Sequence, residues 1–111
     1  MQNTIETLVK AIQLHKPVEF EYIKEGKPPG KRIGNPHAVF EDTTRDGVDN
    51  IYTHIVQTSG VSESITVFPK WRLFFIDNII NIRILEEEQS FTIQEGYNPH
   101  STMYSRAIQK I

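Results

Sequence analysis

Two arginines and three ring-bearing side chains are the residues of this chain best suited to bind a ligand. An arginine presents a planar fork of N–H donors to phosphate or carboxylate, and an aromatic ring can stack on a nucleic-acid base. Two of the rings lie two positions apart in an alternating segment, so they share one face of a strand. The candidate ligand-binding residues are Tyr22, Arg32, Tyr52, His54 and Arg72.

A structural role is the competing interpretation of the same residues. Arg72 would then pair with Asp77 or with a glutamate at the surface, and the tyrosines would belong to the core. A second basic group, formed by Lys27, Lys31 and Arg32, surrounds the Pro/Gly-rich stretch EGKPPGK. That group would either meet phosphates or simply solvate a loop.

Sequence motifs for catalysis and metal binding are missing. There are no cysteines, which removes thiolate zinc sites, cysteine nucleophiles and disulfides. The four histidines form no HExxH motif, no G-x-S-x-G elbow occurs, and EGKPPGK lacks the spacing of a phosphate loop. We therefore expect no metal, no cofactor and no catalytic residue, and we rank a small hydrolase below a binding protein.

The elements that must position the candidate residues follow from the periodicity of apolar side chains. Helical spacing predicts a helix from about Thr4 to about His15. Period-two alternation predicts five strands within about residues 17–85. These strands run over Val18–Tyr22, Arg32–Phe40, Ile51–Gln57, Val67–Ile76 and Ile80–Leu85.

Proline and glycine add two local predictions. The stretch Gly34-Asn35-Pro36 predicts a bend, at an edge or a bulge, because proline cannot donate to a strand ladder. Asn98 as a cap with Pro99 at the first helical position predicts a second helix over about residues 99–110. Short antiparallel strands in series favour a small barrel or a strongly curved sheet, since both protect strand edges.

Length and charge bound the class of protein. At 111 residues the chain is expected to form one domain, 1–111. A net charge of −2 lacks the basic footprint of many nucleic-acid binders, so such a site would be a local patch. No run of 18 apolar residues and no signal-peptide core occur, so we expect no membrane association. The absence of cysteine is typical of a reducing cytoplasm.

Five stretches, taken in order, resemble a WYL domain over about residues 5–111. They are LVKAIQLHKPVEFEY, KRIGNPHAVF, NIYTHIVQ, WRLFFIDNIINIRIL and FTIQEGYNPHSTMYSRAIQKI, the last of which is similar to the tail of small stand-alone WYL-like bacterial proteins. The resemblance implies an SH3-like or Sm-like antiparallel β-barrel that binds a nucleotide or nucleic acid. It also implies a sensing role in transcription regulation or phage defence, with Arg32 and Arg72 at positions where a basic residue is usual.

Three features of the sequence depart from the family pattern. The Trp-Tyr-Leu signature reads Ile51-Tyr52-Thr53, and Phe75 and Asn78 stand where basic residues are common. Because cations supply much of the affinity for phosphates, their loss favours an alternative function. In that alternative the domain is a protein–protein assembly module with a degenerate ligand face, and the apolar C-terminal helix and exposed strand edges form a homodimer.

Overall fold

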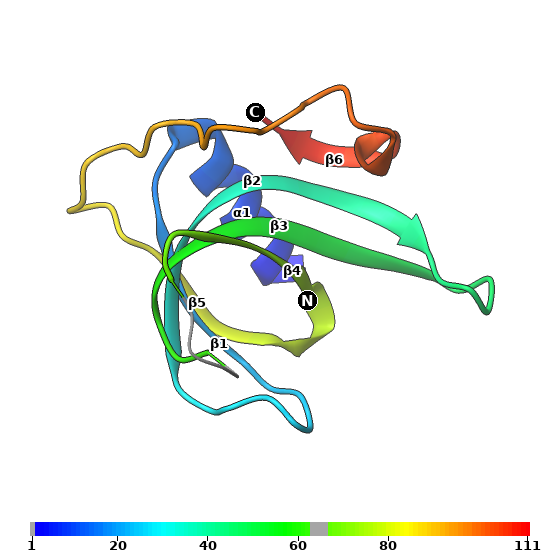
Figure 1. The fold of residues 1–111 in the computed structure, drawn as a ribbon, viewed down its shortest axis with the longest axis horizontal. Coiled ribbons are helices and arrows are strands. Elements are labelled where there is room, and N and C mark those ends of the chain that lie inside the picture. Colours follow the sequence, from blue (N-terminus) through cyan, green and yellow to red (C-terminus); the bar gives the residue numbers. More distant parts are fainter. Residues whose placement is uncertain (1, 63–66) are drawn as a thin grey trace.

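The computed structural model describes residues 2–62 and 67–111 and contains one helix, two short 3-10 turns and six strands (Figure 1). The N-terminal half holds α1 (Gln2–Leu14), β1 (Val18–Tyr22), β2 (Lys31–Thr43) and β3 (Asp49–Gly60). The C-terminal half holds β4 (Lys70–Phe75), η1 (Ile76–Asn78), β5 (Ile79–Ile84), η2 (Thr102–Tyr104) and β6 (Ala107–Lys110). Within these described ranges no helix has the length and apolar character needed to cross a membrane.

The strands form one antiparallel, strongly curved sheet in the order β4-β3-β2-β1-β5, with β6 paired to β2 (Figure 1). The mainly β class and the N-terminal helix are therefore confirmed. The two ends of the sheet, β4 and β5, follow each other in the chain through η1 and do not pair within the described residues. The sheet is thus curved but not closed.

The first helix ends where the sequence predicts, in a Schellman motif. His15 adopts a left-handed φ of 53°. The Lys16 N–H bonds to the Ala11 carbonyl at 2.9 Å, and the His15 N–H bonds to the Ile12 carbonyl at 3.2 Å. These bonds satisfy carbonyls that the end of a helix otherwise leaves unpaired. Pro17 then prevents the helix from continuing.

The main core lies between α1 and the concave side of the sheet. The alternation of β1 is confirmed, because its three apolar side chains are buried and its two glutamates are half-buried. Burying side chains of this size stabilises the fold by about 1.5–3 kcal/mol each relative to exposure. The fully or nearly buried members are Leu8, Ala11, Ile12, Val18, Phe20, Tyr22, Val39, Ile55, Phe74, Ile76 and Ile79.

The predicted bend in β2 is confirmed as two shifts of register against β3, one between Ile33 and Gly34 and one between Pro36 and Ala38. A Cβ atom at Gly34 would lie 2.5 Å from Ile55 Cγ2, so only glycine fits there. The bend divides one edge of β2 between two partners. β1 pairs with residues 31–34 and β6 pairs with residues 38–40.

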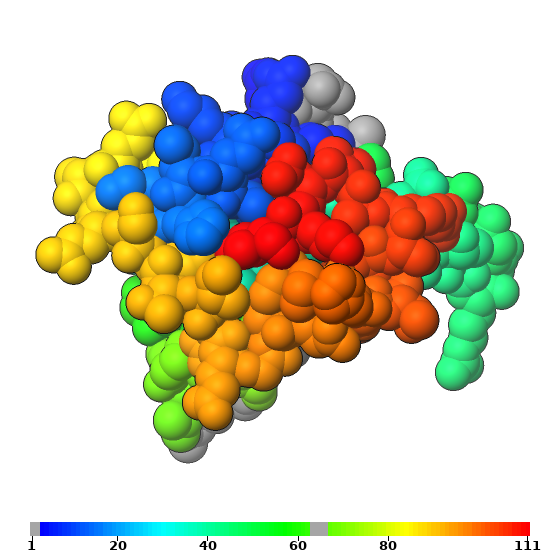
Figure 2. Space-filling model, turned by 90° about the horizontal axis from the view of Figure 1, so that it is seen from above, coloured from blue at the N-terminus to red at the C-terminus, as the bar shows by residue number. Residues whose placement is uncertain are grey.

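The predicted C-terminal helix over residues 99–110 is wrong. Only Thr102–Tyr104 coils, as η2, and Ser101 caps this turn by accepting the Met103 N–H at 3.3 Å. The residues that follow form β6, because the edge of β2 beyond β1 offers unpaired backbone groups that a helix could not satisfy. Figure 2 shows this C-terminal segment lying alongside α1.

Candidate ligand-binding site

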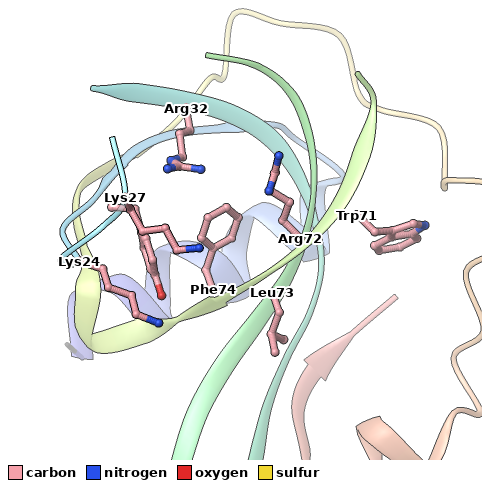
Figure 3. Close-up of a pocket in the computed structure, with 8 residues that line it drawn as sticks. Lys24, Lys27, Arg32, Trp71, Arg72, Leu73 and Phe74 are labelled. Atoms are coloured by element: carbon pink, nitrogen blue, oxygen red, sulfur yellow. The ribbon is translucent and has the colours of Figure 1, made fainter. Parts of the chain in front are cut away.

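A cavity of about 270 Å³ lies between the loop after β1, the start of β2 and the inner face of β4. Figure 3 shows Lys27, Arg32 and Arg72 converging on this space around the Phe74 ring, while Trp71 and Leu73 point away from it. Among the described residues, no aspartate or glutamate lines the cavity. Its cationic side chains are Lys24, Lys27, Arg32 and Arg72, and we call it the basic cavity.

Arg32 is the most constrained of these cations, since only 2% of its surface is exposed. Its guanidinium carbon lies 5.9 Å from the Tyr22 ring centre and 5.6 Å from the Phe74 ring centre. Its Nη1 donates to Gln57 Oε1 at 3.4 Å. The aromatic faces offset part of the cost of burying the charge. Arg32 is therefore a fixed positive charge at the base of the cavity.

Arg72 reaches the same space from β4. Its Nη2 donates to Ser62 Oγ at 2.7 Å, and its strand partner across the sheet is Ile55. Asp77 belongs to η1, and no ion pair joins it to Arg72 within the described parts of the chain. Of the two pairings that the structural interpretation offered for Arg72, the one with Asp77 is therefore wrong. The Arg72 guanidinium points toward the cavity (Figure 3).

Tyr22 has two roles in this site. Only 6% of its surface is exposed, and its hydroxyl oxygen accepts the Phe75 N–H at 3.0 Å, which ties β1 to the end of β4. The same ring lines the basic cavity beneath Arg32. Tyr22 therefore belongs to the core, and its ring also lines the basic cavity.

Tyr52 and His54 share one face of β3, as the sequence predicts, but that face is turned away from the basic cavity. Directly paired residues of neighbouring strands lie on the same face, and Ile55 pairs with Arg72 while His54 pairs with Leu73. Tyr52 and His54 instead pack against Phe40, at ring distances of 6.1 and 6.2 Å. The structure therefore brings together Tyr22, Arg32 and Arg72 and separates them from the other two candidates.

The rings on this outer face form a second cluster that the sequence does not single out. His54 Nδ1 lies 2.8 Å from the Tyr104 hydroxyl, and Trp71 lies 5.1 Å from the His54 ring. Burial lowers the pKa of His54 and raises the pKa of Tyr104 to about 12. Both groups are therefore uncharged at neutral pH. Tyr97 and Tyr104 of the C-terminal segment complete the cluster. No local sequence pattern predicts their position, because the pairing of β6 with β2 holds this segment against the sheet.

His37 lies fully buried beside this cluster, and the sequence does not single it out either. Its Nδ1 donates to the Asn35 carbonyl at 2.9 Å, and its Nε2 accepts the Gln94 N–H at 3.0 Å. This pair of bonds fixes the neutral tautomer with the proton on Nδ1. Burial is the main cause that lowers the pKa of His37, although the bond to Asn35 opposes it.

The basic group predicted around EGKPPGK is divided in the structure. Lys27 and Arg32 line the basic cavity, whereas Lys31 lies outside it and its Nζ is 3.5 Å from Glu19 Oε1 at the surface. Lys24 joins the cavity although it was not predicted. Its position next to the same loop is the signal that could have identified it.

Phe75 and Asn78, where the WYL resemblance leads us to expect basic residues, both lie away from the basic cavity. The Phe75 ring packs 5.8 Å from the Tyr52 ring on the outer face. Asn78 ends η1, and its carbonyl accepts the Ile23 N–H at 2.8 Å. Neither residue lines the cavity, so a basic residue at either position would not be expected to belong to its described lining.

In the described residues, no group of three or more histidine, cysteine, aspartate or glutamate side chains is placed to hold a metal ion. Comparison of the chain with family models, curated proteins and solved structures finds no match.

Proposed function

We propose that this chain is a ligand-binding module whose basic cavity takes the phosphate of a nucleotide or nucleic acid. The observation that carries the proposal is the arrangement of four cations, from Lys24, Lys27, Arg32 and Arg72, around the Tyr22 and Phe74 rings. Guanidinium groups bind phosphate oxygens through paired N–H donors, and lysines add point charges. A local field of this kind attracts an anion even though the whole chain carries a net charge of −2.

The proposal includes the WYL-like fold and role. The strand order β4-β3-β2-β1-β5, with a 3-10 turn that joins the end strands β4 and β5 in the chain, supports an SH3-like or Sm-like barrel. The resemblance of the five sequence stretches supports a sensing role in bacterial transcription regulation or phage defence. A cytoplasmic location fits a chain without cysteine.

Binding of labelled single-stranded DNA, RNA and mononucleotides at two salt concentrations tests the proposal. Affinity should fall with salt, with a slope of about −0.7 in log–log units for each single-strand phosphate contacted. Arg72→Ala and Lys24→Ala should weaken binding and make this slope shallower. Lys10→Ala is the matched control, because Lys10 lies at the surface, 3.7 Å from Glu86 and outside the cavity.

Two outcomes would refute the proposal. One is the absence of binding to every probe at low salt, where the electrostatic contribution is largest. The other is equal affinity of the wild type, Arg72→Ala and Lys24→Ala proteins, which would place any binding outside the basic cavity. Arg32→Ala is a weaker test, since removing a buried side chain that contacts Gln57 also lowers stability.

Assembly with a second copy of the chain is the alternative function. It is supported by the two end strands, β4 and β5, which have one sheet partner each in the described residues. Leu73 on β4 is 52% exposed and Ile80 on β5 is 41% exposed. The C-terminal helix once expected to serve a dimer does not form. Sedimentation at high concentration tests this function, and a monomer would exclude it.

A further inference from the structure

A second cavity, of about 230 Å³, lies on the outer face of β4. Its walls include the rings of Trp71, Tyr97 and Tyr104, together with His54 and Asn98. In the described lining there is no lysine, arginine, aspartate or glutamate. We call it the aromatic cavity. Its uncharged walls contrast with the four cations of the basic cavity.

The aromatic cavity has the chemistry needed to hold a planar, uncharged ring. The Trp71 and Tyr97 rings are 6.1 Å apart and inclined by only 24°, so two nearly parallel aromatic rings line the cavity. His54 is held through Nδ1 by the Tyr104 hydroxyl, and its Nε2 makes no hydrogen bond to the described residues. Stacking surfaces combined with ring nitrogens and amides are what proteins use to hold unpaired nucleobases.

Trp71 is among the residues that line both cavities, which lie on opposite faces of β4. Consecutive residues of a strand point to opposite faces, so Arg72 faces the basic cavity while the Trp71 ring points away from it (Figure 3). β4 is an end strand whose only sheet partner in the described part of the chain is β3. A ligand strand that crosses the outer edge of β4 would reach both faces.

From this placement we infer that the ligand is a single-stranded nucleic acid rather than a mononucleotide. One phosphate lies in the basic cavity beside Arg72, and a neighbouring base enters the aromatic cavity beside Trp71. The inference rests on the proposed phosphate site and adds to it a second subsite that recognises bases. A strand crossing the edge of β4 gains both contacts, whereas a short ligand gains one.

Trp71 is the only tryptophan of the chain, so its fluorescence reports directly on this junction. Three probes separate the contributions: a short oligothymidylate, an abasic oligodeoxynucleotide of the same length, and thymidine monophosphate. The oligothymidylate should quench the fluorescence and bind roughly 5- to 150-fold more tightly than the abasic strand, which is the range for one stacked base. Thymidine monophosphate should bind more weakly than the oligothymidylate.

Variants show which cavity supplies each contribution, measured by anisotropy of labelled strands. Trp71→Leu should bring the affinity ratio between the oligothymidylate and abasic strands close to one, whereas Trp71→Phe, which retains a ring, should keep most of it. Arg72→Ala should weaken both strands and leave their ratio unchanged. Circular dichroism and thermal unfolding check that each variant is folded.

The possible failures are distinguishable. The second subsite is overturned if the oligothymidylate and the abasic strand bind with equal affinity. It is also overturned if the oligothymidylate and thymidine monophosphate bind with equal affinity. Either result leaves phosphate binding in place. An affinity ratio that Trp71→Leu does not change also overturns it. If neither the strands nor thymidine monophosphate bind at low salt, both the second subsite and the proposed function are refuted.

Discussion

Replacing His37 by glutamine should remove much of the acid sensitivity of this fold. The imidazole of His37 is fully buried, and both of its nitrogens are used in the neutral form. A proton added to Nε2 would face the Gln94 N–H and break that hydrogen bond. Electrostatic repulsion from His15 and His54 also lowers the pKa of His37.

The direction of the pH dependence follows from the lowered pKa of His37. Its ordinary value is 6.5, and burial lowers it in the folded protein. The unfolded chain therefore binds a proton at a higher pH than the folded chain does. The stabilising contribution is complete above about pH 6.5 and is lost as the pH falls through the folded-state pKa, with a slope of at most about 1.4 kcal/mol per pH unit.

The substitution also has a cost at neutral pH. Loss of the two hydrogen bonds, at 2.9 and 3.0 Å, should destabilise the variant by about 2 kcal/mol. Loss of ring contacts with Trp71 and Tyr97, at 4.9 and 5.2 Å, adds to this. The variant should therefore be less stable than the wild type at about pH 8, and the difference should narrow toward about pH 5.

Urea unfolding between about pH 8 and about pH 5 measures both effects. His54 retains its own lowered pKa, so the variant should keep part of the pH dependence. His100→Gln is the matched control, because it makes the same substitution at an exposed histidine. A variant with the same pH slope as the wild type, or a wild type that gains stability as the pH falls below 6.5, would refute the role given to His37.

Three further substitutions test other parts of the structure. Tyr104→Phe should lower stability by about 1 kcal/mol in thermal unfolding, because it removes the 2.8 Å hydrogen bond to His54. Gly34→Ala should lower it by about 1–3 kcal/mol in urea unfolding, since the new methyl group would lie 2.7 Å from the Val56 carbonyl oxygen; unchanged stability would contradict the tight bend. Arg106→Ala, which breaks a 2.8 Å surface ion pair with Glu41, should change the free energy of unfolding by less than about 1 kcal/mol, and the difference should shrink as salt is added.

Local patterns predicted the first helix, β1 and the bend of β2 because these depend on neighbouring residues. The tail was mispredicted for the opposite reason. Asn98 and Pro99 are genuine helix-start signals, but the residues after Tyr104 gain more from pairing with β2 than from continuing a coil. Tertiary contacts of this kind override weak local preferences.

Of the five candidate residues, Tyr22, Arg32 and Arg72 line one cavity, and Tyr52 and His54 do not. The sequence could not predict this division because it does not give the register between β3 and β4. Arg72 lies opposite Ile55, which places it on the inner face with Arg32. A shift of one residue in the register between β3 and β4 would have placed Arg72 opposite His54. Arg72 would then share the face of Tyr52 and His54 instead of the face of Ile55. Alternation within a strand gives the two faces but does not tell which of them meets the ligand.

The division of one edge of β2 between β1 and β6 has a consequence for how the chain reaches its native state. Residues 31–34 find β1 through a short local loop, whereas residues 38–40 must wait for a strand from the far end of the chain. Until that long loop closes, Ala38, Val39 and Phe40 present an apolar edge with open backbone groups. Docking of β6 and aggregation are thus competing reactions of the same open edge of β2. An added peptide with the sequence of β6 would bind this edge in the intermediate.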